Sequence, residues 1–265
     1  MTLPIVPLFG RWLFLTAKLK RSRDPKSSKI FLNILTESLL EDKTLVTRVI
    51  LVRHGQSNFN AQQKTQGRTD ESVLTESGRS MAVQVAEALK EIAFDAIYSS
   101  PLQRARHTAE IIHANLSASA PAPQTSQKLL EIDLPLWEHL HKTDIETKFP
   151  DEYRCWKERP HEFKMTLSTP EGEIEHFPVL ALYEQATQFW QELLARHTSG
   201  TVMIVAHNGI NRCLLGTALD FPPATYHSIQ QSNCGINVLN FSGGLGDAVQ
   251  LESMNQLAHL GDPFP

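Results

Sequence analysis

The sequence predicts an α/β protein with a mainly parallel sheet, and two patterns in the chain predict it. Short apolar runs rich in β-branched residues alternate with longer segments in which apolar residues recur every three or four positions. Three of the apolar runs end in polar residues, as strands of open α/β sheets do where they meet a ligand. The chain has 265 residues, 41% hydrophobic and 20% charged, so it is long enough to bury one sizeable core.

Four apolar runs are the expected strands of this sheet. They are "RVILVR" (48–53), "FDAIYSS" (94–100), "TVMIVAH" (201–207) and "GINVLNF" (235–241). Because segments with helical periodicity lie between them, the runs are expected to form βαβ units, which favours a parallel arrangement.

Helices are expected between the strands, each from a capping signal or from helical periodicity. Thr75 is the expected N-cap of a helix that reaches about Ile92. Ser100 followed by Pro101 is a second start signal, for a helix that reaches about Asn115. Two further helices are expected, one over 180–197 and one capped by Asn208.

The chain divides into a central domain with flanking segments. Residues 1–46 combine an apolar start with a basic run and are expected to form an N-terminal extension that packs loosely or frays. An anchor for an acidic membrane or partner is the alternative, although prolines interrupt the apolar part. The domain is expected over 47–245, with a lid inserted at about 127–178, and 246–265 reads as a tail or linker.

The composition argues against several classes of protein. A formal net charge of −4 does not suit a dedicated nucleic-acid binder, which needs a broad basic face. Three widely spaced cysteines without CxxC spacing fit a reducing cytoplasm better than a disulfide framework. No apolar run approaches the ~20 residues of a membrane-spanning helix, and the apolar N-terminus lacks the basic region of a signal peptide. Any anion must then be bound locally, and homodimerisation is left open.

Polar residues at three strand ends are expected to converge on one site. His54 follows the first strand, Arg104 comes shortly after the second, and His207 ends the third. Arg53 and Arg104 offer planar donor forks for phosphate oxygens, and the free N–H groups of the helix that begins near Arg104 would add to them. One neutral imidazole can attack phosphorus while a second, protonated one stabilises the transferred group, so these residues predict phosphoryl transfer.

Four sequence blocks resemble the histidine phosphatase superfamily, in its phosphoglycerate-mutase-like branch. They are "RHGQSNFN", "LTESGR", "YSSPLQRARHTAEII" and "VAHNG", in the order and spacing of that family, and the resemblance covers about residues 48–241. It implies a three-layer α/β/α fold with helices on both faces of a mostly parallel sheet. It also implies a phosphoric monoester hydrolase that acts without a metal or other cofactor.

The resemblance implies a role for each matching residue. His54 corresponds to the histidine that becomes phosphorylated, and Glu131, in "KLLEIDLPLWEHL", to the carboxylate that protonates the leaving alkoxide and then activates water. Arg53, Arg104 and His207 correspond to the catalytic phosphate pocket. Substrate contacts are implied for Arg53, Asn60, Gln66, Gly67, Arg104 and Asn208.

The segment around Glu131 departs from the family pattern. Many relatives have glycine where Pro135 and His139 stand, so the local backbone is expected to differ from theirs. Glu138 is a second carboxylate in this segment, without an assigned role.

The lid segment carries cations, one or two of which could neutralise a substrate carboxylate. The candidates are Lys142, Lys148, Arg154, Lys157, Arg159 and Lys164. A solvated surface position is the simpler interpretation of any one of them, and Arg154 and Arg159 offer the better donor forks.

The substrate is expected to be a small phosphorylated metabolite. "EIDLPLWEHL", "KFPDEYRCWKERPHEF" and "QSNCG" resemble plant 2-carboxyarabinitol 1-phosphate phosphatases and their cyanobacterial relatives, which implies a sugar phosphate or sugar-acid phosphate. Phosphoglycerate mutase activity and a non-catalytic module that binds a phosphorylated metabolite are the alternatives.

Three other patterns are expected to be structural. His139 and His141 alternate as metal ligands on a strand would, but no third ligand is evident and a solvated loop is the better interpretation. Cys234 lies in no Cys-His motif and is expected to fill a gap in the core. The glycine-rich "SGGLGD" (242–247) is expected to be a turn.

Overall fold

The computed structural model describes residues 45–261. Most of the predicted N-terminal extension and the last four residues lie outside the described residues. Among the described helices, none combines the length and the apolar character needed to cross a membrane.

A six-stranded sheet forms the centre of the domain, with the strand order β3-β2-β6-β1-β7-β8. Its strands are β1 (Thr47–Arg53), β2 (Ala96–Ser99), β3 (Gln124–Thr125), β6 (Gly200–Ala206), β7 (Ile236–Phe241) and β8 (Val249–Gln256). The first four are parallel to one another, β7 pairs with β1 in the antiparallel sense, and β8 pairs with β7 in the same way. The prediction of a mostly parallel sheet is confirmed.

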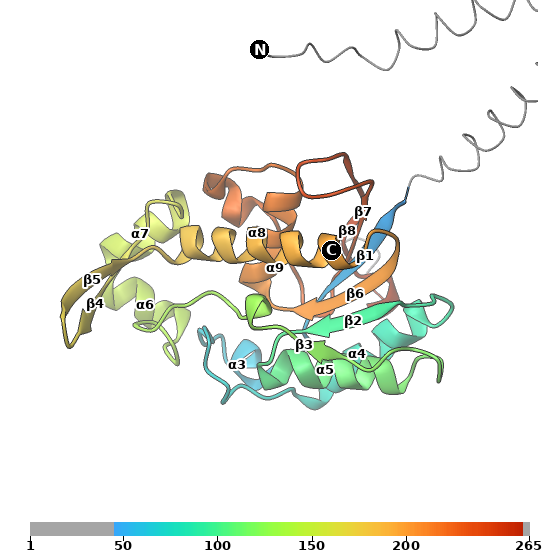
Figure 1. Ribbon diagram of the computed structural model, residues 1–265. Coiled ribbons are helices and arrows are strands. Elements are labelled where there is room, and N and C mark those ends of the chain that lie inside the picture. The colour runs from blue at the N-terminus through green and yellow to red at the C-terminus, as the bar shows by residue number, and fades with distance from the viewer. Residues whose placement is uncertain (1–44, 262–265) are drawn as a thin grey trace, which may run out of the picture. The chain divides into compact units, whose positions relative to one another are not determined.

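Helices cover both faces of the sheet, which confirms the predicted three layers (Figure 1). The helices α4 (Glu76–Leu89) and α5 (Gln103–Ala114) lie on one face, and α8 (Pro178–Arg196) and α9 (Asn208–Ala218) lie on the other. Alternate residues of the central strand β1 point to opposite faces. Val49 and Leu51 belong to the core cluster with α8 and α9, whereas Ile50 and Val52 belong to the cluster with α4. β1 is therefore buried from both sides, as its unbroken apolar run predicted.

The helix ends agree with the sequence in one case and differ in two. The Thr75 side chain caps α4 by accepting a hydrogen bond from the Gly78 N–H, as predicted. The second helix begins at Gln103 rather than at Pro101. In α9, Asn208 is the first helical residue and His207 occupies the N-cap position, so the prediction of Asn208 as the cap was wrong. The Asn208 side chain instead donates to the Gln231 carbonyl.

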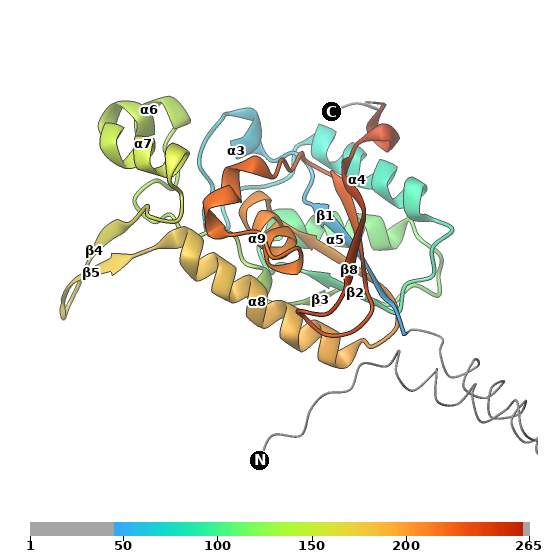
Figure 2. The ribbon, with the colours of Figure 1, turned by 90° about the horizontal axis from the view of Figure 1, so that it is seen from above.

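The inserted segment forms a small lid that extends to one side of the sheet (Figure 2). It contains the short helices η1 (Gln127–Leu129), α6 (Lys142–Lys148) and α7 (Pro150–Glu158) and the hairpin of β4 (Met165–Thr169) and β5 (Gly172–His176). Aromatic rings join it to the domain. Trp156 of the lid lies 5.4 Å from Tyr226 in η2 (Pro223–Ser228), and within the lid the Trp137 ring lies 4.7 Å from that of Phe163, measured between ring centroids. The lid thus shares the main core rather than standing apart.

The C-terminal segment differs from the tail or linker predicted from residue 246 onward. Val249–Gln256 forms the edge strand β8, and the short helix η3 (Ala258–Leu260) follows it. The alternating burial along β8 is typical of a strand with one face on a protein core and one in solvent.

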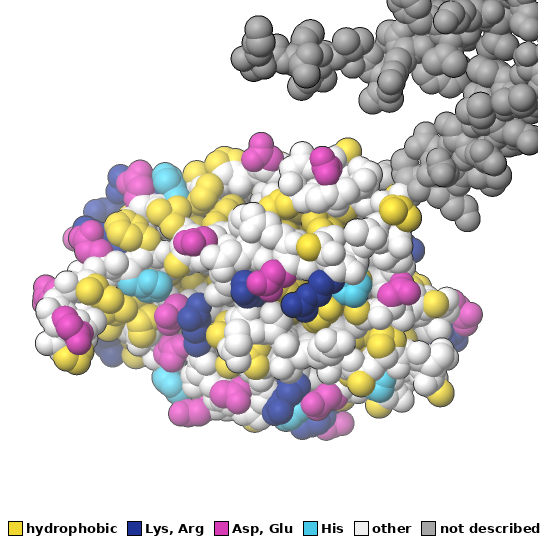
Figure 3. Space-filling view, viewed as in Figure 1, with side chains coloured by type: hydrophobic (Ala, Val, Ile, Leu, Met, Phe, Trp, Pro, Cys, Tyr) yellow, Lys and Arg dark blue, Asp and Glu magenta, His cyan; other side chains and the backbone are white. Residues whose placement is uncertain are grey.

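Charges are mixed on the molecular surface. On the face shown in Figure 3, Lys and Arg side chains are interspersed with Asp and Glu side chains, so the described residues form no broad basic area there.

Candidate active site

Two histidines meet at the carboxyl edge of the parallel strands. His54 directly follows β1 and His207 directly follows β6, its parallel neighbour in the sheet. Their ring centroids are 5.2 Å apart with an interplanar angle of 62°, and both side chains are buried. The convergence predicted from the strand ends is therefore present for this pair.

The His54 ring is held in one tautomer. Its Nδ1 lies 2.7 Å from the carbonyl oxygen of Gly55, which can only accept, so Nδ1 carries the proton of the neutral ring. Burial and the charges of Arg53 and Arg104 lower the pKa of His54 well below its usual value. The neutral ring then presents an unprotonated Nε2, the form that can act as a nucleophile.

His207 is neutral in the same surroundings. Burial, followed by the charges of Arg104, His54 and Arg53, lowers the pKa of His207 well below its usual value. Neither ring nitrogen has a hydrogen-bond partner in the described part of the chain. The expected protonated form of His207 therefore requires an anion beside it, because a bound phosphate would offset the charges of the two arginines.

Arg104 is fixed by the backbone of a neighbouring loop. Its two terminal nitrogens donate to the carbonyl oxygens of Thr69 and Gly67 at 2.8 and 2.9 Å, and its side chain is completely buried. Burial lowers the pKa of Arg104 to about 10, so the guanidinium remains a cation at neutral pH. Its buried Nε has no partner among the described residues. An unpaired donor on a buried cation is costly unless an anion binds it.

Arg53 repeats this arrangement from the end of β1. One terminal nitrogen donates to the Gln231 carbonyl at 2.8 Å, and its buried Nε lacks a partner in the described chain. Burial lowers the pKa of Arg53 to about 10 as well. The unpaired donors of Arg53 and Arg104, together with His207, suit the oxygens of a phosphoryl group.

One expected contribution to this anion site is missing. The N–H groups at the start of α5 were expected to be free, but the Gln103 N–H donates to the Asp70 carboxylate and the Leu102 N–H to the Ser100 hydroxyl. The first N–H group of the helix is thus already bonded and is not available to an anion.

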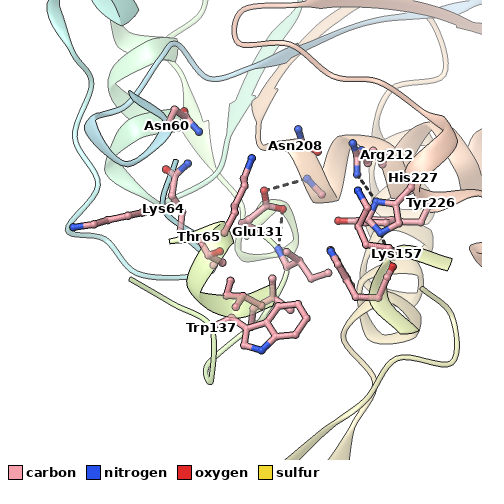
Figure 4. Close-up of a pocket in the computed structure, with 18 of the residues that line it drawn as sticks. Asn60, Lys64, Thr65, Glu131, Trp137, Lys157, Asn208, Arg212, Tyr226 and His227 are labelled. Atoms are coloured by element: carbon pink, nitrogen blue, oxygen red, sulfur yellow. Dashed lines mark hydrogen bonds between the residues drawn. The ribbon is translucent and has the colours of Figure 1, made fainter. Parts of the chain in front are cut away.

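The Glu131 carboxylate lies against the N-terminus of α9. One of its oxygens accepts from the Ile132 and Ile210 N–H groups, and the other accepts from Gly209 N–H at 3.0 Å. A Cβ at position 209 would lie 2.4 Å from the Glu131 carboxylate, so this contact needs glycine. Glu131 and His54 line the same cavity, which is drawn in Figure 4.

Comparison with known proteins identifies the family of this domain. The family model described as histidine phosphatase superfamily, branch 1, matches residues 49–254. The chain belongs to the histidine phosphatase superfamily.

Individual members of the superfamily resemble the chain to different extents. It is 36% identical to the probable 2-carboxy-D-arabinitol-1-phosphatase of Arabidopsis thaliana, over 97% of this chain and 50% of that protein. The chain therefore spans about half the length of this relative. A phosphoserine phosphatase structure from Entamoeba histolytica has a TM-score of 0.66 at 28% identity and covers 81% of this chain and 99% of its own. The structure of YhfR of Bacillus stearothermophilus has a TM-score of 0.69 at 26% identity, and the match covers 81% of this chain and 99% of its own.

Asn60 in α3 (Asn58–Ala61) and Gln66 and Gly67 in the loop after it line the cavity. The Asn60 side-chain oxygen accepts from the Ser57 N–H, and the Gln66 oxygen accepts from the Ser57 hydroxyl. Gly67 has a φ of +53°, and a Cβ there would lie 2.3 Å from the Glu138 carboxylate. Close packing against Glu138 thus requires glycine at position 67.

Glu138 is the residue whose place in the site the sequence did not indicate. Its Oε1 accepts from the N–H groups of Arg68 and Thr69, in the loop whose carbonyl groups hold Arg104. Its charge also raises the pKa of Arg104, against the larger effect of burial. Glu138 therefore links the lid segment to the loop that holds Arg104. Its position directly before the His139-Leu140-His141 stretch offered no periodic signal for this contact.

The backbone at His139 was expected to differ from that of relatives with glycine at this position, and this expectation was wrong. Its φ is +65°, so histidine adopts the left-handed conformation that glycine favours. The backbone at this position therefore does not avoid the conformation available to a glycine. The described residues contain no group of three or more His, Cys, Asp or Glu side chains placed to hold a metal.

The cavity in front of His54 has a volume of about 290 Å³. This is near the lower end for small-molecule sites, so it suits a small metabolite. Lid residues line its outer part, including Trp137, Lys142 and Lys157. The two lid arginines expected to offer the better forks do not line it. Arg154 pairs with Asp151 and Arg159 pairs with Glu162, all four on the exposed surface.

Proposed function

We propose that this protein is a metal-independent phosphomonoesterase that transfers the phosphoryl group of a small metabolite to His54 and then to water. One observation carries the proposal: a buried imidazole with its proton held on Nδ1 lies among unpaired cationic donors. The unprotonated Nε2 supplies the nucleophile, and Arg53 and Arg104 supply the positive charge that a metal provides in other phosphoryl-transfer sites.

The first transfer begins when the His54 Nε2 attacks phosphorus. The Nε2–P bond forms while the bond from phosphorus to the ester oxygen breaks, and Glu131 gives its proton to the leaving alkoxide. Arg53, Arg104 and His207 bind the equatorial oxygens, on which negative charge must be stabilised. The alcohol then leaves with that proton, and phosphohistidine remains.

Water completes the reaction in the second transfer. The Glu131 carboxylate takes a proton from water as the oxygen attacks phosphorus, the P–Nε2 bond breaks, and inorganic phosphate leaves. His54 and protonated Glu131 are restored, so the cycle balances without an added oxidant, reductant or cofactor.

The cavity and the relatives support the proposed substrate class. The small cavity favours a compact phosphate ester, and the similarity to the probable 2-carboxy-D-arabinitol-1-phosphatase supports a sugar phosphate or sugar-acid phosphate. The proposal includes 2-carboxyarabinitol 1-phosphate as a candidate.

Trapping the intermediate tests the proposed function. Rapid mixing with a ³²P-labelled sugar phosphate, followed by an alkaline quench, should give label on the protein that is lost on acid treatment and is released as inorganic phosphate during turnover. His54→Ala should abolish labelling and turnover, whereas His107→Ala, outside the cavity on α5, should retain both. Chelation with EDTA should leave turnover unchanged. Turnover by His54→Ala, or its loss in EDTA, would refute this mechanism.

A further inference from the structure

The cavity is more cationic than the binding of one phosphoryl group requires. Its lining contains one acidic side chain, Glu131, and five basic ones. The basic side chains are Arg53, Lys64, Lys142, Lys157 and Arg212. Within the described residues none of these five forms an ion pair, whereas four lid cations outside the cavity do so, namely Lys128, Arg154, Arg159 and Lys164. Lys164, for example, pairs with Glu175.

Arg212 is fixed in orientation although it has no carboxylate partner. Its NH1 lies 3.2 Å from His227 Nδ1, and its guanidinium carbon lies 5.1 Å from the centroid of the Tyr226 ring. His227 Nε2 lies 2.7 Å from the Trp156 carbonyl, so Nε2 carries the proton and Nδ1 accepts from Arg212. The buried Nε of Arg212 is left without a partner in the described part of the protein. The guanidinium is thus a pre-oriented fork with free donors.

His227 stays unprotonated over the range in which enzymes usually work. Burial, together with the charges of Arg212 and Lys157, lowers the pKa of His227 to about 4 despite its bond to the Trp156 carbonyl. Arg212 contacts one nitrogen of this ring, and the carbonyl of Trp156, the residue before Lys157, contacts the other, so both cations come from residues next to His227. Figure 4 shows Arg212, His227 and Lys157 on one side of the cavity and Lys64 on the opposite side.

Lys64, on the opposite side of the cavity, contacts an aromatic ring. The Lys64 ammonium lies 5.7 Å from the centroid of the Phe59 ring, in a cation–π arrangement. The charge of Arg212 also lowers the pKa of Arg53, so Arg212 and Lys157 extend the positive charge from the phosphate pocket along the cavity. Two cations kept close without an anion repel each other, so a ligand anion between them would be favoured.

We propose that Arg212 and Lys157 form a subsite for a carboxylate group on the same substrate molecule that presents its phosphoryl group to His54. A planar carboxylate matches the free edge of a guanidinium fork, and a small cavity with only two cations there favours it over a second phosphate. The inference rests on the proposed function and narrows it, because phosphate esters of hydroxy acids are then preferred over esters of neutral sugars.

Binding to a protein that cannot turn over tests the subsite separately from catalysis. In the His54→Ala background, calorimetry compares 6-phosphogluconate with glucitol 6-phosphate, which differ only by a carboxylate in place of a hydroxymethyl group. We expect 6-phosphogluconate to bind about 10- to 100-fold more tightly, the effect of a charge-assisted hydrogen-bonded pair. Equal affinities for the two ligands would overturn the subsite.

Substitutions then test which residues cause the tighter binding of 6-phosphogluconate. Adding Arg212→Gln or Lys157→Gln should remove most of it, and Lys157 is exposed, so its replacement leaves the core intact. Arg154→Gln is the matched control, because Arg154 lies on the same helix but pairs with Asp151. A preference that survives both cavity substitutions, or that falls equally in the control, would overturn the assignment.

Turnover by the protein with His54 intact separates the two proposals. Hydrolysis of both esters with similar kcat/KM would leave the phosphatase in place and overturn the subsite. A binding preference without any phosphohistidine or released phosphate would support the subsite and refute the proposed function.

Discussion

Gly78, in the first turn of α4, lies directly against the backbone that follows the proposed nucleophile. A Cβ added at Gly78 would lie 2.0 Å from the Gln56 carbonyl oxygen, and one added at Gly55 would lie 2.3 Å from the Gly78 carbonyl oxygen. Both partners are backbone atoms, so no side-chain rotation can relieve the overlap in Gly78→Ala. Either the helix or the loop after His54 must move by about 1 Å to restore an ordinary contact.

Two opposing effects set the stability of Gly78→Ala. Alanine gains up to about 1 kcal/mol over glycine in a helix, whereas overpacking costs about 1–3 kcal/mol. Because the contact is between backbones, the cost should lie near the upper end and leave a net loss of about 2 kcal/mol, or roughly 4–8 °C in Tm for a domain of this size. Displacing a catalytic group by about 1 Å costs about 100-fold in rate, so kcat/KM should also fall by about 100-fold.

Steady-state kinetics and scanning calorimetry measure the two effects. The matched control is Gly244→Ala, at an exposed position where the added Cβ would make an ordinary contact 3.7 Å from the Asp247 carboxylate. The control should retain both kcat/KM and Tm. If Gly78→Ala also retained both, the packing of α4 against this loop would not position His54.

Two other predictions concern charge and positioning. Below pH 6.5 the free energy of unfolding should fall by about 1 kcal/mol per pH unit for each of His54 and His207. Burial lowers their pKa values in the folded protein, so the unfolded chain takes up protons that the folded protein does not; urea unfolding at pH 5, 6 and 7 measures this, and an unchanged free energy would contradict it. Glu138→Ala should raise the inhibition constant for inorganic phosphate about 10-fold, because the loop that holds Arg104 loses its acceptor. Glu138→Gln keeps an acceptor oxygen and should recover most of the loss, whereas equal defects in both variants would exclude the hydrogen bonds as the cause.

The parts of the fold that depend on local pattern could be predicted from the sequence. The apolar run of β1 and the Thr75 cap of α4 are local signals, and both elements formed where they were expected. The strand β8 was missed although it alternates in burial, because its apolar residues are mixed with polar ones and it follows a glycine-rich turn. A strand at the sheet edge needs less apolar surface, so its sequence signal is weaker.

In the site, contacts between residues far apart in the chain could be predicted only in part. His54 and His207 could be paired because each follows a parallel strand, a rule that places strand ends at one edge. The choice between Arg154 and Lys157 could not be made, because a short helix does not reveal which side it turns toward the cavity. The positions of Arg212 and Glu138 depend on which loops pack against them, which only the tertiary structure specifies.

The central position of β1 has a consequence for how the site is assembled. His54 is attached to a strand whose partners in the sheet, β6 and β7, come from the C-terminal part of the chain. Pairing between distant segments is slow because the intervening chain must first be closed into a loop. Helices α4 and α5 can form early without producing any arrangement of histidines and arginines. After dilution from denaturant, enzymatic activity would therefore return with the slowest folding phase and report the completed sheet.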